Sequence, residues 1–409
     1  MKFEAPRGTR DILPGERLWW SAVAAIEEIV PRYGYRRIQT PVFEDTNLIH
    51  RTSGAGSDVV QKETYTFEDR GGRSLTLRPE GTAPIVRAYL EHGLHREPKP
   101  VKLFTIATMY RFAAPQRGRY REHTQLSAEV IGSADPAVDA ELIQLFDEIL
   151  RHTGVRGYEL RLNSIGDQVC RPAYIEALNA WLDEHADVLD EEARMKRATS
   201  PLRVFDVKNE RVRAALEGAP KIGESLCDEC RLHFAQVRHA LEVLGVAYVL
   251  DPTLVRGLDY YTRTTFEFIE LSRADRQQNA IGGGGRYDGL VEQLGGEPTP
   301  GIGFGLGLDR LVLALEEAAV TPDELRLDAF IVTEDKEPLL PILVQLRRAG
   351  LAVDVDYAGR SRNAQIKHAQ RLDPRSIVVV EDGQAVVRQR GREDRRIALG
   401  DLVATLTPR

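Results

Sequence analysis

The chain has 409 residues, more than one ordinary domain holds, which predicts two or three domains. A hydrophobic fraction of 42% and a charged fraction of 29% exclude wholesale disorder. No apolar run approaches the roughly 20 residues that cross a bilayer, and the first residues lack the apolar segment of a secretory signal. The chain also has only 3 cysteines, too few for a disulfide framework. From these features together we expect a cytoplasmic protein with no membrane partner.

The net charge is −7, from 55 basic and 62 acidic residues, which by itself argues weakly against a nucleic-acid partner. The charge is unevenly distributed along the chain. Residues 326–409 contain 15 basic and 12 acidic residues, a balance of +3, so the remainder carries −10. A basic-leaning tail on an acidic body is compatible with local contact to a polynucleotide.

Apolar residues at helical spacing predict a helix at residues 18–30, ended by Pro31 and Gly34. An extended segment interrupted by Pro41 follows. Beyond it we expect strands at 64–67, 74–77, 101–110 and 124–131, and helices at 82–92 and 137–153. Because strands and helices mix without strict βαβ alternation, the pattern favours an α+β fold with an antiparallel sheet.

The second half of the chain changes character twice. Helical sequence predominates from 169 to 250, strand-like sequence resumes at 254, and a helix to 319 precedes a linker at 320–326. The tail then alternates strands (329–332, 352–356, 377–380) with helices (339–349, 363–372), as a compact α/β module does. The predicted domains are therefore a body of residues 1–168 and 251–319, a helical insertion of residues 169–250, and a C-terminal domain of residues 326–409.

Two glycine-rich segments stand out. In residues 301–310, GIGFGLGLDR, the four glycines fall on one face of a strand and leave it bare, so a flat ligand can lie against it. A strand packed closely under a helix would also need such a face, but the arginine that follows favours the ligand. Residues 280–288, AIGGGGRYD, fit a flexible hairpin turn and a ligand-contacting loop equally well.

Three arginines lie in apolar or aromatic sequence: Arg111, Arg256 and Arg310. Each needs an anion or a carboxylate, because an unpaired buried charge is costly. Singly, such arginines are more often structural ion pairs. Neither GxGxxG in a strand–turn–helix context nor GxxxxGK[ST] is present, so side chains rather than a glycine-rich loop would hold phosphates. Together the three arginines indicate polyphosphate binding.

One cluster has metal-like spacing: Cys227, Cys230 and His233, with His239 available as a fourth ligand. A structural zinc site usually shows two paired knuckles, and only one is visible. The same spacing is ordinary for half-buried residues of a helix. We therefore name no metal ligand from the sequence.

Residues 254–268, LVRGLDYYTRTTFEF, resemble the histidine-binding signature of histidyl-tRNA synthetases. Similar to the same family are residues 6–14, 76–82 and 118–121, with Gln125 and Glu129. The segments around Pro41, Arg111 and Arg310 match the three general motifs of class II synthetases. This resemblance covers nearly the whole chain. It implies a class II synthetase-type antiparallel sheet flanked by helices, with a helical insertion and a C-terminal anticodon-binding-type module.

The resemblance also implies a reaction. Histidine attacks the α-phosphate of ATP to give histidyl-adenylate and pyrophosphate, and the histidyl group then passes to tRNA(His). Mg²⁺ would accompany the phosphates. The resemblance further implies a homodimer, with the segment around Pro41 at its interface.

By resemblance, the histidine site contains Glu80, Thr82, Gln125, Glu129, Tyr260 and Tyr261. The first three would hold the substrate ammonium, a task for acceptor groups. Glu129 and Tyr261 would hydrogen-bond the two imidazole nitrogens. Such a site rejects amino acids that lack these nitrogens, because its own polar groups would be left unpaired.

The ATP site follows from the resemblance in the same way. Arg111 and Arg256 are the implied catalytic residues, which would grip the α-phosphate and spread the charge of the transition state. Arg310 would stack on adenine above the bare glycine face. Arg119 and His123 complete the implied ATP-binding set.

The departures from the family pattern cluster in one loop. Ala113 stands where the family has a glutamate that meets the adenine amino group, and Ala114 where an arginine often reads the acceptor end of tRNA. His123 stands at the position of the aromatic that sandwiches adenine. We hypothesise that this loop recognises the acceptor end differently from most bacterial relatives.

The tail segment 357–369 resembles the strand-to-helix part of the family's anticodon-binding module. Its basic groups could contact phosphates, and Gln365 could reach a base edge, although a solvated helix face is an equally good interpretation of any one residue.

Two other functions stay open at this point. A non-catalytic paralogue that serves as the histidine-sensing regulatory subunit of ATP phosphoribosyltransferase shares the catalytic fold. That family generally lacks the tail module, so the tail and the site residues favour the enzyme, whereas Ala113 and Ala114 keep the paralogue open. The second is a pure RNA-binding protein that uses only the tail, and the intact site residues argue against that function.

Overall fold

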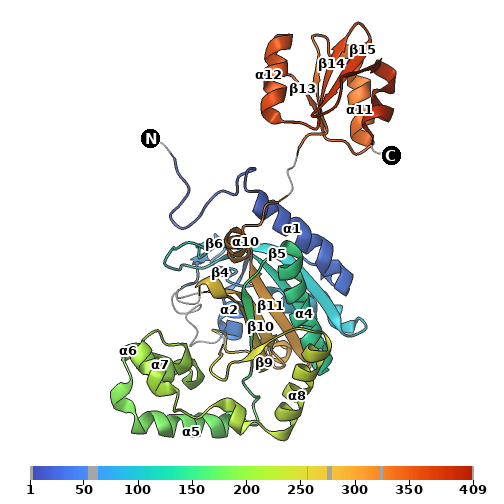
Figure 1. The fold of residues 1–409 in the computed structure, drawn as a ribbon. Coiled ribbons are helices and arrows are strands. Elements are labelled where there is room, and N and C mark those ends of the chain that lie inside the picture. The colour runs from blue at the N-terminus through green and yellow to red at the C-terminus, as the bar shows by residue number, and fades with distance from the viewer. Residues whose placement is uncertain (1–2, 54–62, 256, 274–278, 323–325, 408–409) are drawn as a thin grey trace. The chain divides into compact units, whose positions relative to one another are not determined.

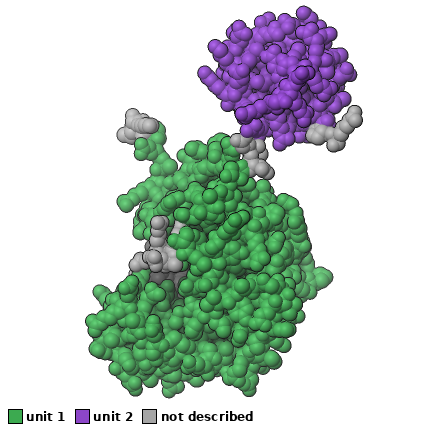
Figure 2. Space-filling model, in the orientation of Figure 1, with its two compact units in different colours: residues 1–322 green, residues 323–409 purple. Residues whose placement is uncertain are grey.

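The computed structural model describes residues 3–53, 63–255, 257–273, 279–322 and 326–407. The chain divides into two compact units, Met1–Pro322 and Asp323–Arg409 (Figure 2). Among the described residues, no helix is long and apolar enough to cross a membrane.

An eight-stranded sheet forms the centre of the first unit (Figure 1). Its strands lie in the order β1 (Arg36–Arg37), β5 (Val101–Tyr110), β6 (Glu122–Ile131), β11 (Gly301–Gly307), β10 (Ala280–Arg286), β9 (Thr262–Glu270), β7 (Tyr158–Ser164) and β8 (Val249–Leu250). All neighbours pair antiparallel except the outermost pairs, β1 with β5 and β7 with β8. The predicted α+β class with an antiparallel sheet is confirmed.

Helices cover one face of this sheet. They are α1 (Arg17–Ile29), α4 (Pro136–Thr153), α8 (Asp228–Val243) and α10 (Leu308–Glu317). Their apolar faces share one buried cluster with the strands, in which the ring of Phe146 on α4 stacks on Phe268 of β9 at 4.3 Å. Strand alternation sends Phe104 into this cluster and its neighbour Leu103 to a second cluster on the opposite face.

The opposite face of the sheet is only partly covered. A three-stranded sheet lies there with the order β2 (Phe43–Asp45), β4 (Ser74–Leu77), β3 (Thr66–Glu68), beside α2 (Thr46–Ser53), α3 (Thr82–Glu91) and α9 (Leu290–Gln293). The second buried cluster joins Ile85 and Tyr89 of α3 to Leu103 and to Tyr261.

Helices fill the stretch that the sequence predicts as an insertion: α5 (Arg171–Glu184), α6 (Glu191–Thr199), α7 (Glu210–Leu216) and α8. The first three share a core of their own, around Tyr174, Leu178 and Val204. The later part of α8 instead packs into the main core through Val237 and Leu241. The predicted three-domain division stays a prediction, because these helices belong to the same compact unit as the sheet.

The glycine run at 280–288 is neither a hairpin turn nor a loop, so that part of the sequence interpretation is wrong. Residues 280–286 form β10, paired on both sides with β9 and β11. The glycines permit unusually close backbone approach, since a Cβ on Gly284 would lie 1.9 Å from the carbonyl oxygen of Gly303.

The second unit is a five-stranded sheet with helices. The strand order is β13 (Val353–Val355), β12 (Ala329–Val332), β14 (Ser376–Glu381), β15 (Gln384–Gln389) and β16 (Arg395–Ala398), and the helices are α11 (Leu340–Arg348), α12 (Arg362–Leu372) and α13 (Leu402–Leu406). The predicted strands and two helices are present. The sequence pattern does not predict the antiparallel strands β15 and β16, because their polar and charged residues obscure the strand alternation.

The sequence suggested that Gln365 could reach a base edge. The structure contradicts this suggestion. Its side chain is 2% exposed and holds the end of β12 in place. The amide nitrogen donates to the carbonyls of Thr333 and Arg360, and the amide oxygen accepts from the N–H of Thr333 at 3.0 Å. Gln365 therefore has a structural role within its unit.

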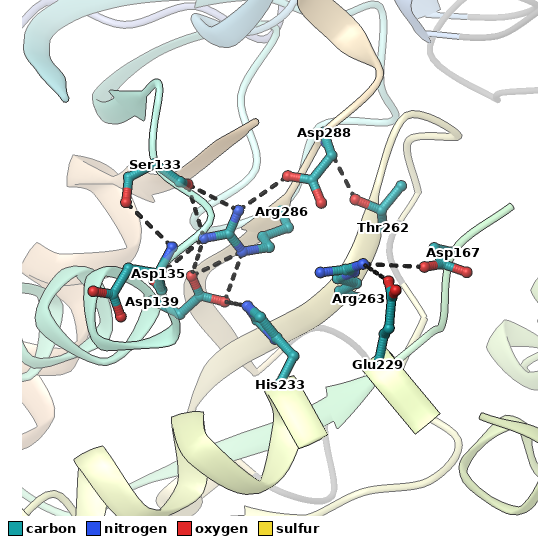
Figure 3. Close-up of polar contacts among 10 residues, drawn as sticks. All are labelled: Ser133, Asp135, Asp139, Asp167, Glu229, His233, Thr262, Arg263, Arg286 and Asp288. Atoms are coloured by element: carbon teal, nitrogen blue, oxygen red, sulfur yellow. Dashed lines mark hydrogen bonds and ion pairs between the residues drawn. The ribbon is translucent and has the colours of Figure 1, made fainter. Parts of the chain in front are cut away.

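A buried ion pair ties the sheet to α4 (Figure 3). The fully buried guanidinium of Arg286, on β10, donates to both carboxylate oxygens of Asp139 and to the carbonyl of Ser133. His233 of α8 lies against the same carboxylate, with Nε2 3.6 Å from Oδ2. Because Asp139 is already paired with Arg286, it does not stabilise the protonated imidazole of His233. Burial, with the positive charges of Arg286 and Arg263, lowers the pKa of His233 to about 3.

This shift predicts a pH dependence of stability. The unfolded chain protonates His233 near pH 6.5, but the folded chain does so only near 3, so stability is lost as the pH falls below 6.5. At pH 5 the loss through this residue is about 2 kcal/mol. His233→Gln should therefore show a shallower decline of unfolding free energy between pH 7 and 5, measured by urea denaturation. His239→Gln, exposed on the same helix, should keep the wild-type decline; an identical decline in His233→Gln would contradict the assignment.

Candidate functional site

A cavity of about 530 Å³ opens on the partly covered face of the large sheet. It is lined by nine of the site residues named from the sequence: Glu80, Thr82, Arg111, Arg119, His123, Gln125, Tyr260, Tyr261 and Arg310. Arg256 lies outside the described residues, and Glu129 lies below the cavity rather than on its wall. Residues far apart in the chain therefore converge on one site.

One wall of the cavity is built at the start of α3. The carboxylate of Glu80 accepts the backbone N–H groups of Thr82 at 2.6 Å and Ala83 at 2.9 Å, so it fixes the first turn of the helix. Burial raises the pKa of Glu80, and these N–H groups oppose that rise. The arrangement presents carboxylate and hydroxyl oxygens to the cavity, which suits a ligand that donates hydrogen bonds.

Glu129 supports this wall from beneath. It is fully buried, and its two oxygens accept from the hydroxyls of Thr82 and Tyr287, each at 2.7 Å. Burial raises the pKa of Glu129 well above its ordinary value. Its direct contact with an imidazole stays a prediction, whereas its contact with Thr82 positions a residue that lines the cavity. Sequence reasoning missed Tyr287, although it lies only two residues after Gly285, the last glycine of its segment.

The glycines of β10 and β11 form the floor. Gly282, Gly283, Gly305 and Gly307 line the cavity. The face is not bare along its whole length, however, because neighbouring side chains use the vacated space. A Cβ on Gly303 would lie 1.7 Å from Oε2 of Glu129, and one on Gly301 would lie 2.2 Å from the ring of Tyr287.

Arginines form the other wall. Arg111 donates to the carbonyl of Pro79 at 2.8 Å, and Arg310 to that of Gly118 at 2.6 Å. Arg119 pairs with Glu63, a carboxylate that no sequence pattern marked. Burial lowers the pKa of Arg111, which means that a bound anion would stabilise its charged form.

His123 stands among these arginines on β6. Burial, with the charges of Arg111, Arg310 and Arg119, lowers its pKa to about 3, so the imidazole is neutral at physiological pH. Its buried Nδ1 has no hydrogen-bond partner within the described part of the chain. Ala113 also lines the cavity, and Ala114 is exposed.

The antiparallel sheet, its helical face and this two-walled cavity define a class II aminoacyl-tRNA synthetase. A solved structure of apo histidyl-tRNA synthetase from S. aureus superposes with a TM-score of 0.83 at 35% identity, covering 100% of both chains. Residues 8–311 match the family Histidyl-tRNA synthetase. The chain belongs to that family.

Curated relatives agree over the full length. A histidine–tRNA ligase from Desulforudis audaxviator is 45% identical and covers 99% of both chains, and one from Halothermothrix orenii is 44% identical and covers 98% of both. A Bacillus halodurans protein titled ATP phosphoribosyltransferase regulatory subunit/histidyl-tRNA synthetase has a TM-score of 0.65 at 24% identity and covers 93% of this chain and 98% of its own. That likeness shows the fold alone.

The close contact between Gly303 and Glu129 makes the floor sensitive to added volume. Gly303→Ala forces the buried carboxylate of Glu129 away from Thr82 and Tyr287, and overpacking of this kind costs about 1–3 kcal/mol. We expect a clear loss of unfolding free energy in urea. Gly223→Ala is the control, because a Cβ there meets no atom within 4 Å. Equal stability of the two variants would show that Glu129 is not confined as described.

Proposed function

We propose that this chain is a histidine–tRNA ligase, which forms histidyl-adenylate from histidine and ATP and then charges tRNA(His). One observation carries the proposal: a single cavity joins a wall of hydrogen-bond acceptors to a wall of arginines across a glycine floor. An ammonium-bearing substrate suits the first wall and a polyphosphate suits the second.

The acceptor wall is the proposed histidine site. Glu80, Thr82 and Gln125 would hold the ammonium group, and Tyr261 would contact an imidazole nitrogen. Arg171 supports this arrangement, because it donates to the backbone carbonyl of Tyr261. The nucleophile is the carboxylate of histidine itself, so no protein base is required. Positioning is then the main contribution of these residues.

The arginine wall is the proposed ATP site. Arg111 and Arg256 would hold the α-phosphate and stabilise the charge that builds in the transition state. Arg310 and His123 would contact the base. A neutral His123 can offer its unpartnered Nδ1 to the nucleotide without adding charge. Arg119 would exchange its pairing with Glu63 for a phosphate.

The residues of the cavity also fit Mg²⁺, which binds through one or two carboxylates together with substrate phosphates. Glu267 of β9 lines the cavity and would hold the ion. When bound, Mg²⁺ supplies neutralisation of the phosphate charge.

We also infer a cytoplasmic homodimer. Exposed apolar side chains support it near the segment around Pro41: Val42 is 41% exposed, Phe43 49% and Phe67 44%. Phe43 and Phe67 pack edge to face at 6.4 Å and form one patch. Apolar patches of this kind commonly mark subunit interfaces.

The second unit is the proposed anticodon-binding module, with the first unit divided into a catalytic domain and a helical insertion. On α12, Asn363 and Lys367 are exposed and suited to phosphate contact. Arg360 and Arg362 pair with Asp356 and Glu381.

Histidine-dependent exchange of pyrophosphate into ATP tests the enzyme directly. We expect exchange with histidine and none with other amino acids. Absence of exchange in folded protein that binds histidine would reject the ligase and favour the regulatory paralogue.

Arg111→Lys tests the proposed role of the arginine wall. The ammonium of lysine cannot make the two parallel bonds of a guanidinium, so we expect the exchange rate to fall about 100-fold while histidine affinity is retained. Arg117→Lys, 63% exposed in the same loop and paired with Glu316, is the control and should behave as wild type. Equal loss of exchange and of histidine affinity in Arg111→Lys would contradict the assignment.

The substituted loop at Ala113 and Ala114 leads to a prediction on tRNA. Without the arginine that often reads the acceptor end, charging should depend weakly on the first base pair of tRNA(His). Steady-state charging of transcripts with that pair exchanged measures this. A full dependence on an extra 5′ guanosine would show that other groups read the acceptor end.

A further inference from the structure

All 3 cysteines of the chain meet at one place in the first unit. The sulfurs of Cys170, Cys227 and Cys230 and a carboxylate oxygen of Asp167 all lie within 4.8 Å of one another. Cys170 and Cys230 are buried, and the other two residues are half-buried. Such a set is a compact group of one hard and three soft ligand atoms, away from the cavity described above.

The four residues form two knuckles of equal spacing. Asp167 and Cys170 are separated by two residues, and so are Cys227 and Cys230. The sequence shows only the second as a CxxC, because an aspartate begins the first. Paired knuckles with two intervening residues are the usual scaffold of a structural zinc site.

The distances fit a tetrahedral ion. With metal–sulfur bonds of about 2.3 Å and metal–oxygen bonds of about 2.0 Å, tetrahedral geometry places two sulfurs about 3.8 Å apart and a sulfur and an oxygen about 3.5 Å apart. The sulfurs of Cys170 and Cys230 lie 4.0 Å apart, and Sγ of Cys170 lies 3.5 Å from Oδ1 of Asp167. Small adjustments bring these four atoms onto one ion.

The surroundings compensate negative ligands. Cys170 is the N-cap of α5 and Cys227 that of α8, so the positive ends of both helix dipoles point at the cluster. The backbone N–H of Asp167 donates to the sulfur of Cys170 at 3.3 Å. Arg263 reaches the outer oxygen of Asp167 at 3.3 Å, as Figure 3 shows, and orients the carboxylate as a supporting residue orients a metal ligand.

We propose that Asp167, Cys170, Cys227 and Cys230 bind one structural Zn²⁺. The tertiary structure thereby supplies partners for Cys227 and Cys230 other than the two histidines weighed in the sequence. His233 does not take part, because its imidazole lies against Asp139, and His239 is exposed. Asp167 and Cys170 take the places of the two histidines.

The position gives the ion a mechanical role. The helical core of α5, α6 and α7 lies between Cys170 and Cys227, so the ion closes this segment at its base. A crosslink that closes a long loop stabilises mainly by restricting the unfolded chain. The neighbouring Arg171 bonds the carbonyls of Ile165 and Tyr261, which connects the base of the segment to the cavity wall.

Metal analysis of the reduced full-length protein tests the proposal. We expect one zinc ion per chain. After the zinc is removed with a chelator, Co²⁺ should bind and give the near-ultraviolet charge-transfer band of thiolate ligands. Cys227→Ser and Cys170→Ser should each weaken binding by more than the roughly 10–100-fold that loss of a supporting group costs.

Two further variants make the ligand set specific. Asp167→Cys completes a four-thiolate site, so it should retain the metal and intensify the Co²⁺ band. His233→Gln and His239→Ala should bind zinc as wild type does. Reduced protein that neither contains zinc nor binds Co²⁺ would overturn the proposal, as would an undiminished Co²⁺ affinity of Cys227→Ser or a loss of the thiolate band in His239→Ala. Thiols that pair as a disulfide in place of binding metal would overturn it too.

Discussion

The close approach of β10 and β11 is the constraint on which the site depends. Two adjacent strands can come this near only where side chains are missing, and a Cβ on Gly284 would meet the carbonyl oxygen of Gly303 at 1.9 Å. The same glycines leave space above the sheet that Glu129 and Gln125 enter from β6. Glu129 then holds Thr82 and Tyr287, so the floor of the cavity also positions its acceptor wall.

The two walls of the cavity differ in electrostatic character. The acceptor wall places Glu80 at the first turn of α3, where backbone N–H groups stabilise its carboxylate. The opposite wall concentrates arginines around His123 and keeps that imidazole neutral. The two walls therefore present different electrostatic environments, one suited to hydrogen-bond donors and the other to anions.

Two side-chain clusters attach the helical segment to this sheet. Arg286 and Asp139 fix β10 to α4, and His233 of α8 packs against them in its neutral form. The cysteine cluster stands where α5 and α8 begin. Both clusters lie outside the cavity, yet Arg171 and Arg263 connect the second one to β9 and to Tyr261. The position of Tyr261 on the cavity wall therefore depends on contacts made outside the cavity.

The sequence by itself determined the fold class, most helices and strands, and nine of the residues that line the cavity, because periodicity is local and the family motifs are specific. It could not determine what lies beside what. The glycine run at 280–288 became a central strand through pairing with both neighbours, and Gln365 became buried through contact with β12. Glu63, Tyr287 and the partnership of Asp167 with three cysteines had no local signal, since their partners lie far along the chain. Only tertiary structure brings such groups together, because burial and pairing are properties of the folded neighbourhood rather than of the neighbouring sequence.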